Sequence, residues 1–164
     1  MKAPQKIIVR AADAADRGSI ERLLTRSWGS TIIVTRGKVH DASRLPALLA
    51  VQGDDIVGLA TFWVAGDECE LMSLDALRKG RGIGSALLAG VANEARRSGC
   101  RRLWLITTND NVDAIRFYQR QGLRLVAIHP GAVDDARRLK PSIPLVGQHG
   151  IPIRDELEFE LELR

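Results

Sequence analysis

Short apolar runs separated by polar turns dominate the first half of the chain. A helix is predicted from a cap at Asp13 or Asp16 to about Trp28, because apolar residues recur at helical spacing from Ile20. The stretch 29–44 that follows is the least regular part of the sequence. Three apolar runs joined by tight turns then predict an antiparallel meander, over 48–52, 56–64 and 68–74.

In the second half, helical and strand patterns alternate. Residues 85–98 have the spacing of an amphipathic helix, and residues 155–164 alternate apolar residues with glutamate, as in a half-buried strand. Between them the pattern predicts a strand over 103–107, a helix over 112–121, a strand over 123–128, a helix over 132–139 and a long loop over 141–152. This order indicates an α/β (α+β) fold, a mixed sheet with helices on its faces.

Length and composition fit one globular domain over residues 1–164. The 164 residues are 45% hydrophobic, which is enough for a core without disulfides or metal. The apolar runs are too short for a membrane-spanning helix, and the first residues lack the features of a secretory signal. Cys69 and Cys100 are far apart without CxxC spacing, which favours buried thiols over a bridge. We therefore expect a cytoplasmic protein without a membrane partner.

The positive charge is concentrated in one segment. The net charge is +4, and residues 78–102 hold seven Lys or Arg against the single acid Glu94, whereas residues 154–164 hold five acids against two arginines. A local anionic ligand explains this distribution as well as a nucleic acid does. Only seven aromatic residues (three Trp, one Tyr and three Phe) are available for stacking on bases. We expect no nucleic-acid partner, and keep a basic nucleic-acid-binding domain as an alternative.

The sharpest local feature is a turn with three alternate glycines between an apolar strand and a helix. Gly80, Gly82 and Gly84 allow a ligand to approach the main chain closely. The free N–H groups and the dipole at the start of the next helix favour an anion. Lys79 and Arg81 add positive charge, so a phosphate or pyrophosphate is the expected ligand.

Two common phosphate-binding motifs do not fit this turn. A Walker loop requires Gly-Lys-Ser or Gly-Lys-Thr, but Gly84 is followed by Ser85 and an alanine. A dinucleotide fingerprint requires a third glycine three residues after the second, where this chain has Ser85 or Leu87. Taken alone, the turn is also compatible with a helix start that binds nothing.

A second segment, NDNVDAIRFYQRQGL, resolves the choice. Together with the glycine turn it resembles the GNAT superfamily of acetyl-coenzyme A-dependent N-acyltransferases. The family's coenzyme loop, Q/R-x-x-G-x-G/A, matches residues 79–84, with a lysine at the first position. Its second signature, N-x-x-A-I-x-x-Y-x-x-x-G-F, matches with Leu123 in place of the phenylalanine, at Asn111, Ala114, Ile115, Tyr118 and Gly122.

The resemblance implies a mostly antiparallel central sheet in which strands 68–74 and 103–107 splay apart. The opening would hold the pantetheine arm of acetyl-CoA, with the N–H of Leu74 near the thioester carbonyl. The resemblance implies coenzyme contacts at these positions: Leu74, Lys79, Gly80, Arg81, Gly82, Ile83, Gly84, Ser85, Asn111, Ala114 and Phe117. The side chains of residues 72–77 are expected to pack in the core.

Tyr118, the only tyrosine, is the candidate general acid. In the family this tyrosine protonates the departing thiolate, and a phenol of pKa about 10 suits a thiolate of pKa about 8.5. Tyr118 follows Asn111 by seven residues, about two helical turns, so both point the same way. The alternative is a core tyrosine whose hydroxyl binds a carbonyl.

A general base and an acceptor cleft are less clearly marked. Glu68 and Glu70 are expected to share one strand face with Met72 and Leu74, where some relatives carry a carboxylate base. Solvated carboxylates or a water relay are equally compatible. By analogy with relatives, three residues are expected to line the acceptor cleft, although core packing also explains both tryptophans: Trp28, Arg36 and Trp63.

The function expected from this resemblance is acetyl transfer from acetyl-CoA to a primary amine by direct attack in a ternary complex. A cysteine intermediate is disfavoured, because Cys69 lies off the face that carries Glu68 and Glu70. The expected partner is a small-molecule or peptide amine, no metal is expected because no His/Cys cluster has ligand spacing, and a homodimer stays open. The alternative is an acyl-CoA-binding or regulatory domain without turnover.

Overall fold

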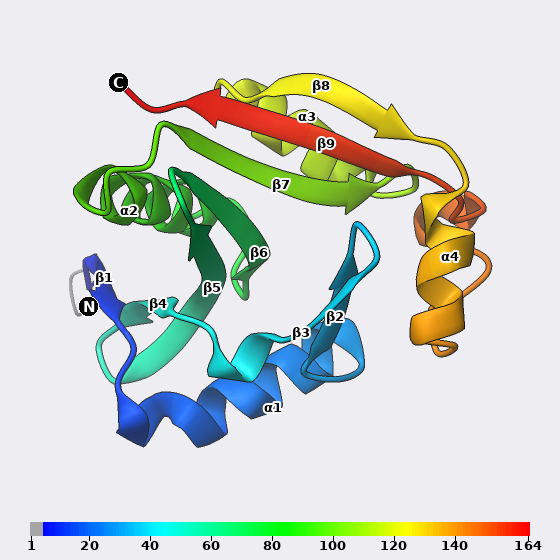
Figure 1. Cartoon of the computed structure of the whole chain (residues 1–164). Helices are drawn as coiled ribbons and strands as arrows, with labels where there is room; N and C mark the ends of the chain where they lie inside the picture. Colours follow the sequence, from blue (N-terminus) through cyan, green and yellow to red (C-terminus); the bar gives the residue numbers. More distant parts are fainter. Residues whose placement is uncertain (1–4) are drawn as a thin grey trace.

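A computed structural model describes residues 5–164 and shows a twisted seven-stranded sheet in the order β1-β4-β5-β6-β7-β9-β8 (Figure 1). The strands are β1 (Ile7–Ala11), β4 (Ala47–Gln52), β5 (Asp55–Ala65), β6 (Glu68–Ala76), β7 (Arg102–Thr108), β8 (Arg124–His129) and β9 (Glu156–Glu162). A separate hairpin consists of β2 (Ile32–Thr35) and β3 (Lys38–Asp41). The α-helices are α1 (Arg17–Trp28), α2 (Ile83–Arg97), α3 (Val112–Arg120) and α4 (Ala132–Leu139).

The pairing confirms the predicted mixed, mostly antiparallel sheet. The meander β4-β5-β6 is antiparallel, and within residues 5–164 only β6 and β7 pair in parallel. Helix α2 connects these two strands as a crossover. One apolar cluster lies under α2 and α3, and a second lies under α1 and the β2–β3 hairpin. Helices therefore cover both faces of the sheet.

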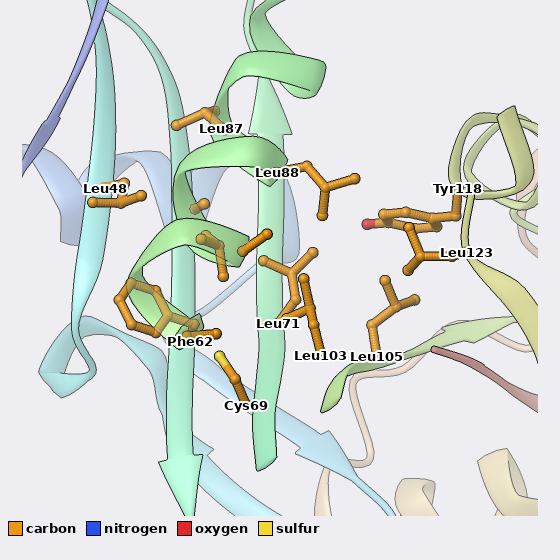
Figure 2. Packing of buried hydrophobic residues seen from close by; sticks show 14 of the residues in the cluster. Leu48, Phe62, Cys69, Leu71, Leu87, Leu88, Leu103, Leu105, Tyr118 and Leu123 are labelled. Atoms are coloured by element: carbon orange, nitrogen blue, oxygen red, sulfur yellow. The ribbon is translucent and has the colours of Figure 1, made fainter. Parts of the chain in front are cut away.

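The large cluster joins α2 and α3 to the centre of the sheet (Figure 2). Leu87 and Leu103 are fully buried in it, and Cys69 and Cys100 are buried free thiols. Figure 2 shows Tyr118 entering this cluster from α3, with its hydroxyl directed toward the centre. No helix within residues 5–164 has the length and hydropathy required to cross a bilayer.

The irregular stretch 29–44 contains the β2–β3 hairpin, which the sequence analysis did not assign. Its turn consists of Arg36 and Gly37, both with positive φ (48° and 73°). Such a turn suits a two-residue hairpin, but arginine is rare at positive φ, so the sequence carries little signal for it. Figure 1 shows the hairpin tip directed toward β7 and β9. Strand β1, also unassigned from the sequence, pairs with β4 at one sheet edge.

A β-bulge in β6 corrects one prediction about side-chain faces. The register with β5 shifts between Thr61, which pairs with Ser73, and Phe62, which pairs with Leu71. Strand β6 therefore contains one extra residue, Met72, at this point. Met72 packs in the α1-side cluster, but Leu74 packs against the α2-side cluster. The prediction that Leu74 shares a face with Glu68, Glu70 and Met72 is therefore wrong, because simple alternation does not continue through the bulge.

Strands β6 and β7 separate as expected. Their ladder begins at Glu68 and Arg102 and ends at Leu71 and Leu105, although β6 continues to Ala76 and β7 to Thr108. The carboxyl-terminal halves of both strands thus leave backbone groups unpaired between them. This opening lies directly before the glycine turn and α2, so a ligand held by the turn can extend between the strands.

Candidate active site

The glycine turn leaves several backbone N–H groups without partners. Gly80 and Gly82 have φ of 71° and 72°, a conformation that favours glycine. Helix α2 begins at Ile83, and the N–H of Ala86 donates its hydrogen bond to Gly82 O. The N–H groups of residues 83–85 therefore have no partner within the helix, and their place at its positive end is suited to binding an anion.

Two of the three cations at the turn, Lys79 and Arg81, are available for a ligand. Arg78 is occupied by Gln52 and Asp55, at 2.5 and 3.1 Å. Lys79 and Arg81 are exposed, and no carboxylate among residues 5–164 forms a salt bridge with either. The residues predicted for pyrophosphate contact thus form one basic turn, from which Arg78 is held back.

Helix α3 supports the turn and borders the opening between the strands. A Cβ on Gly84 would lie 3.2 Å from the ring of Phe117, so glycine here permits close packing of α2 against α3. Asn111 caps α3 by accepting a hydrogen bond from the N–H of Ala114 at 3.3 Å. The two signature segments are therefore in direct contact.

A cavity of about 240 Å³ fills the opening between β6 and β7, and we call it the splay cavity. Its walls come from α1, the separated strand ends, α3 and the 141–152 loop. The lining residues are Ser27, Trp28, Leu71, Met72, Ser73, Leu74, Asp75, Leu105, Ile106, Thr107, Asn111, Ala114, Tyr118 and Gln148. Leu74, Asn111 and Tyr118, predicted from the sequence to act together, all border it.

Tyr118 lies at the wall of the splay cavity and is only 8% exposed. Its ring packs edge-on against Phe117 and tilted against Phe159, with centroids 5.3 and 6.3 Å apart. Within residues 5–164 no side chain or backbone group forms a hydrogen bond with its hydroxyl. Burial, and to a lesser degree the charge of Asp75, raises the pKa of Tyr118 well above its usual value.

Asp75 is a site residue that the sequence analysis missed. It lines the splay cavity and accepts a hydrogen bond from Trp28 Nε1 at 3.0 Å. Burial raises its pKa, although the hydrogen bond from Trp28 opposes the shift. Strict alternation from Glu70 would have placed Asp75 on the opposite face, whereas the bulge turns it toward α1.

Neither of the two glutamates predicted as candidate bases lines the splay cavity. Glu70 is 7% exposed, accepts a hydrogen bond from the Thr35 hydroxyl at 2.8 Å, and has a pKa raised by burial. Glu68 lies near the start of β6, 3.4 Å from Arg102. Neither glutamate is among the described residues that line this cavity or the larger cavity beside it.

A larger cavity of about 730 Å³ adjoins the splay cavity, and we call it the α1–α4 cavity. Both are bordered by Ser27, Trp28, Asn111 and Gln148. Its remaining walls come from β2, α4, the end of β7, the start of β9 and the 141–152 loop. The further lining residues are Gly29, Ile33, Val34, Thr108, Asp110, Val133, Ala136, Lys140, Ser142, Ile143, Pro144, Gly147, Ile153 and Glu156.

The 141–152 loop is fixed as the outer wall of the α1–α4 cavity. Arg137 of α4 donates to the carbonyls of Ile143, Pro144 and Ile153, at 3.3, 2.7 and 2.6 Å. Asp110 accepts from the N–H of Gln148 at 3.0 Å, which ties the loop to the end of β7. The prolines prevent regular structure, and these polar contacts supply the order instead.

The three predicted cleft residues occupy different positions. Trp28 borders both cavities. Arg36 lies over the Trp104 ring, 5.5 Å from its centroid, and 3.4 Å from Glu158. Trp63 is 45% exposed on β5, outside the residues that line either cavity. The structure thus brings Trp28 to the opening and separates the other two from it. Within residues 5–164 no group of three or more acidic, His or Cys side chains is arranged to hold a metal.

A family model and two curated relatives match most of this chain. The model of the Acetyltransferase (GNAT) family matches residues 17–123. The chain is 43% identical over 135 residues to the uncharacterised protein YdhI of Bacillus subtilis, covering 82% of this chain and 84% of YdhI. It is 38% identical over 146 residues to YxbD of the same organism, also uncharacterised, covering 88% and 92% of the two chains.

Solved structures share the fold at lower identity. An IAA acetyltransferase from Bacillus cereus aligns with TM-score 0.75 and 20% identity, covering 96% of this chain and all of that one. An Elizabethkingia anophelis GNAT acetyltransferase with acetyl-CoA bound aligns with TM-score 0.70 and 17% identity, over 96% and 98% of the chains. With the family model spanning both signature segments, this chain belongs to the Acetyltransferase (GNAT) family.

Proposed function

We propose that this protein transfers an acetyl group from acetyl-CoA to a primary amine by direct attack in a ternary complex. The observation that carries the proposal is the junction of two cavities beside an anion-binding turn. The turn suits a diphosphate, the splay cavity suits a thioester arm, and the α1–α4 cavity suits an acceptor. Family membership supports the reaction class, and so does the solved GNAT acetyltransferase with acetyl-CoA bound.

The coenzyme would be held mainly by backbone groups of this chain. The N–H groups of residues 83–85, with Lys79 and Arg81, would bind the pyrophosphate. The pantetheine arm would lie between β6 and β7, where ladder groups beyond Leu71 and Leu105 are free. The N–H of Leu74 would stabilise the oxyanion that forms when the amine attacks the carbonyl.

Two side chains would move protons at opposite ends of the reaction. As the new N–C bond forms and the C–S bond breaks, Tyr118 would donate its proton to the leaving sulfur. The amine must lose a proton, and Asp75 is better placed than Glu68 or Glu70 to accept it, because only Asp75 lines the splay cavity. Burial raises the pKa of Asp75 and so brings it closer to the pKa of the amine.

The experiment is calorimetric titration with acetyl-CoA, followed by a thiol assay of CoA release over a panel of amines. The proposal predicts saturable binding, competition by free CoA, and amine-dependent CoA release. Binding without release for any amine would favour an acyl-CoA-binding or regulatory domain instead. Absence of coenzyme binding, with steeply salt-dependent binding of nucleic acid, would favour the basic nucleic-acid-binding alternative.

A further inference from the structure

The α1–α4 cavity contains three ionisable side chains, and two of them are occupied by the protein. Asp110 is 4% exposed and accepts hydrogen bonds from the Thr108 hydroxyl and the N–H of Gln148. Lys140 directs its ammonium at the carbonyls of Ile32 and Trp28, at 2.7 and 3.4 Å. Both groups hold the cavity wall in place, which leaves the third, Glu156, for a ligand.

Glu156 is a buried carboxylate without an ionic partner. The residue is 3% exposed, and its one hydrogen bond is from the N–H of Arg36 to Oε2, at 3.3 Å. Within residues 5–164 it forms no salt bridge and its second oxygen accepts no hydrogen bond. Such a carboxylate is costly to bury, and a cation or hydrogen-bond donor in the cavity would relieve the cost.

The charges of Arg36 and His129 favour the ionised form of Glu156, but they do not offset the rise in its pKa that burial causes. Arg36 places its guanidinium on Glu158, 3.4 Å away, and stacks on Trp104 rather than turning to Glu156. His129, opposite Glu156 in the β8–β9 ladder, lies 3.4 Å from the same Glu158. Glu70 contributes further negative charge. The end of the α1–α4 cavity at Glu156 is therefore acidic, while most of the cavity wall is apolar.

We propose that the acceptor carries a second cationic group, separated from its reactive amine by an apolar spacer, and that Glu156 binds this group. The inference rests on the proposed acetyl transfer. Glu156 borders the α1–α4 cavity but not the splay cavity, so it contacts the end of the acceptor far from the thioester. The spacer lies along Ile33, Val34 and Ile143, and the reactive amine reaches the junction at Trp28.

Three probes with the same five-carbon chain separate this proposal from simpler ones: 1,5-diaminopentane, pentylamine and 5-aminopentanoate. They present ammonium, methyl or carboxylate at the far end. Binding to the CoA-saturated protein is measured by calorimetry, and acetylation by CoA release. Longer and shorter members of each series are included, because the spacer length is set by the cavity.

We expect the diamine to bind and react about 10–100-fold better than the monoamine, since hydrogen bonds to charged groups have this effect. The aminocarboxylate should be the poorest acceptor. Glu156→Gln, nearly isosteric, should remove the advantage of the diamine over the monoamine. Glu162→Gln, on the exposed end of the same strand, is the matched control and should change neither.

Several results would overturn the proposal. Equal binding of the three probes, or no binding of any of them, would contradict it. Preference for the aminocarboxylate would assign the ligand to Lys140 instead. An unchanged preference for the diamine in a folded Glu156→Gln variant would also contradict it. Failure of acetyl transfer itself is seen separately, because it would abolish acetyl-CoA binding or turnover with every amine. Amine binding by calorimetry can still be measured in that case.

Discussion

Removal of one oxygen atom tests the role of Tyr118. Tyr118→Phe keeps the ring that packs between Phe117 and Phe159, and takes away a hydroxyl that no group among residues 5–164 binds. Because no buried partner is left unsatisfied, the free energy of unfolding should change by less than about 1 kcal/mol. That is a shift of at most about 2–4 °C in Tm for a domain of this size.

The effect on turnover should be much larger than the effect on stability. Loss of a general acid lowers kcat by about 10²–10⁴-fold, equivalent to about 2.7–5.5 kcal/mol in activation free energy. Acetyl-CoA affinity should stay within a few-fold, since the coenzyme is expected to be held by the backbone. The assay combines CoA release for kcat, calorimetry for acetyl-CoA and a thermal melt.

Ser73→Ala is the matched control, because Ser73 also lines the splay cavity and also carries a hydroxyl. Its hydroxyl lies 2.6 Å from that of Thr61, so its loss should destabilise the protein by about 1 kcal/mol without a large change in kcat. Since burial raises the pKa of Tyr118, the phenol stays protonated and causes no fall in kcat below pH 10. A folded Tyr118→Phe variant with wild-type kcat would remove Tyr118 from the mechanism.

Three further variants probe the rest of the site. Asp75→Asn should lower kcat/KM by about 10²–10⁴-fold and abolish the fall of kcat/KM at acid pH. In the wild type this fall should begin at a higher pH than an ordinary aspartate would give, because burial raises the pKa of Asp75. An unchanged pH profile would exclude Asp75 as the base. Gly82→Val should abolish acetyl-CoA binding, seen by calorimetry, whereas Gly66→Val, equally strained at positive φ in a distant turn, should only lower stability; normal affinity in a folded Gly82→Val variant would contradict the loop assignment. Gly147→Ala should raise KM for the amine and leave acetyl-CoA affinity unchanged, because its Cβ would overlap Asp110 and displace the cavity wall; an unchanged KM would show that this wall does not contact the acceptor.

The sequence marked the glycine turn and the neighbouring helix ends more clearly than the acceptor side, because these features depend on residues close together in the chain. The turn at residues 79–84 and the cap at Asn111 depend on neighbours within a few residues, so glycine spacing and capping chemistry reveal them. The start of α2 was predicted at residue 85 and lies at Ile83, an error within the usual uncertainty of helix ends. Local patterns therefore located the turn and its helix, whereas the resemblance to the family signature singled out Tyr118, whose role stays a prediction.

The acceptor side depends on contacts between distant segments. Trp28, Asp110 and Glu156 meet in one cavity although they are far apart in the chain. The alternation of β9 indicated that Glu156 belongs to the polar face of a strand, which usually means solvent, but α4 and the hairpin cover that face. The bulge at Met72 similarly has no local sequence signal, and it decides which way Asp75 points.

The distribution of charge around the two cavities offers a physical account of the basic composition. Among residues 5–164, Lys79 and Arg81 have no salt-bridge partner beside the glycine turn, whereas Asp75 and Glu156 line the cavities where the amine is proposed to bind. A diphosphate and an ammonium group would each be attracted to its own end of the site and disfavoured at the other. If this separation guides the order of binding, added salt should weaken acetyl-CoA binding at the exposed turn more than diamine binding at the buried Glu156, because buried charges are screened less. Equal salt dependence of the two affinities would show that charge separation has no part in placing the substrates.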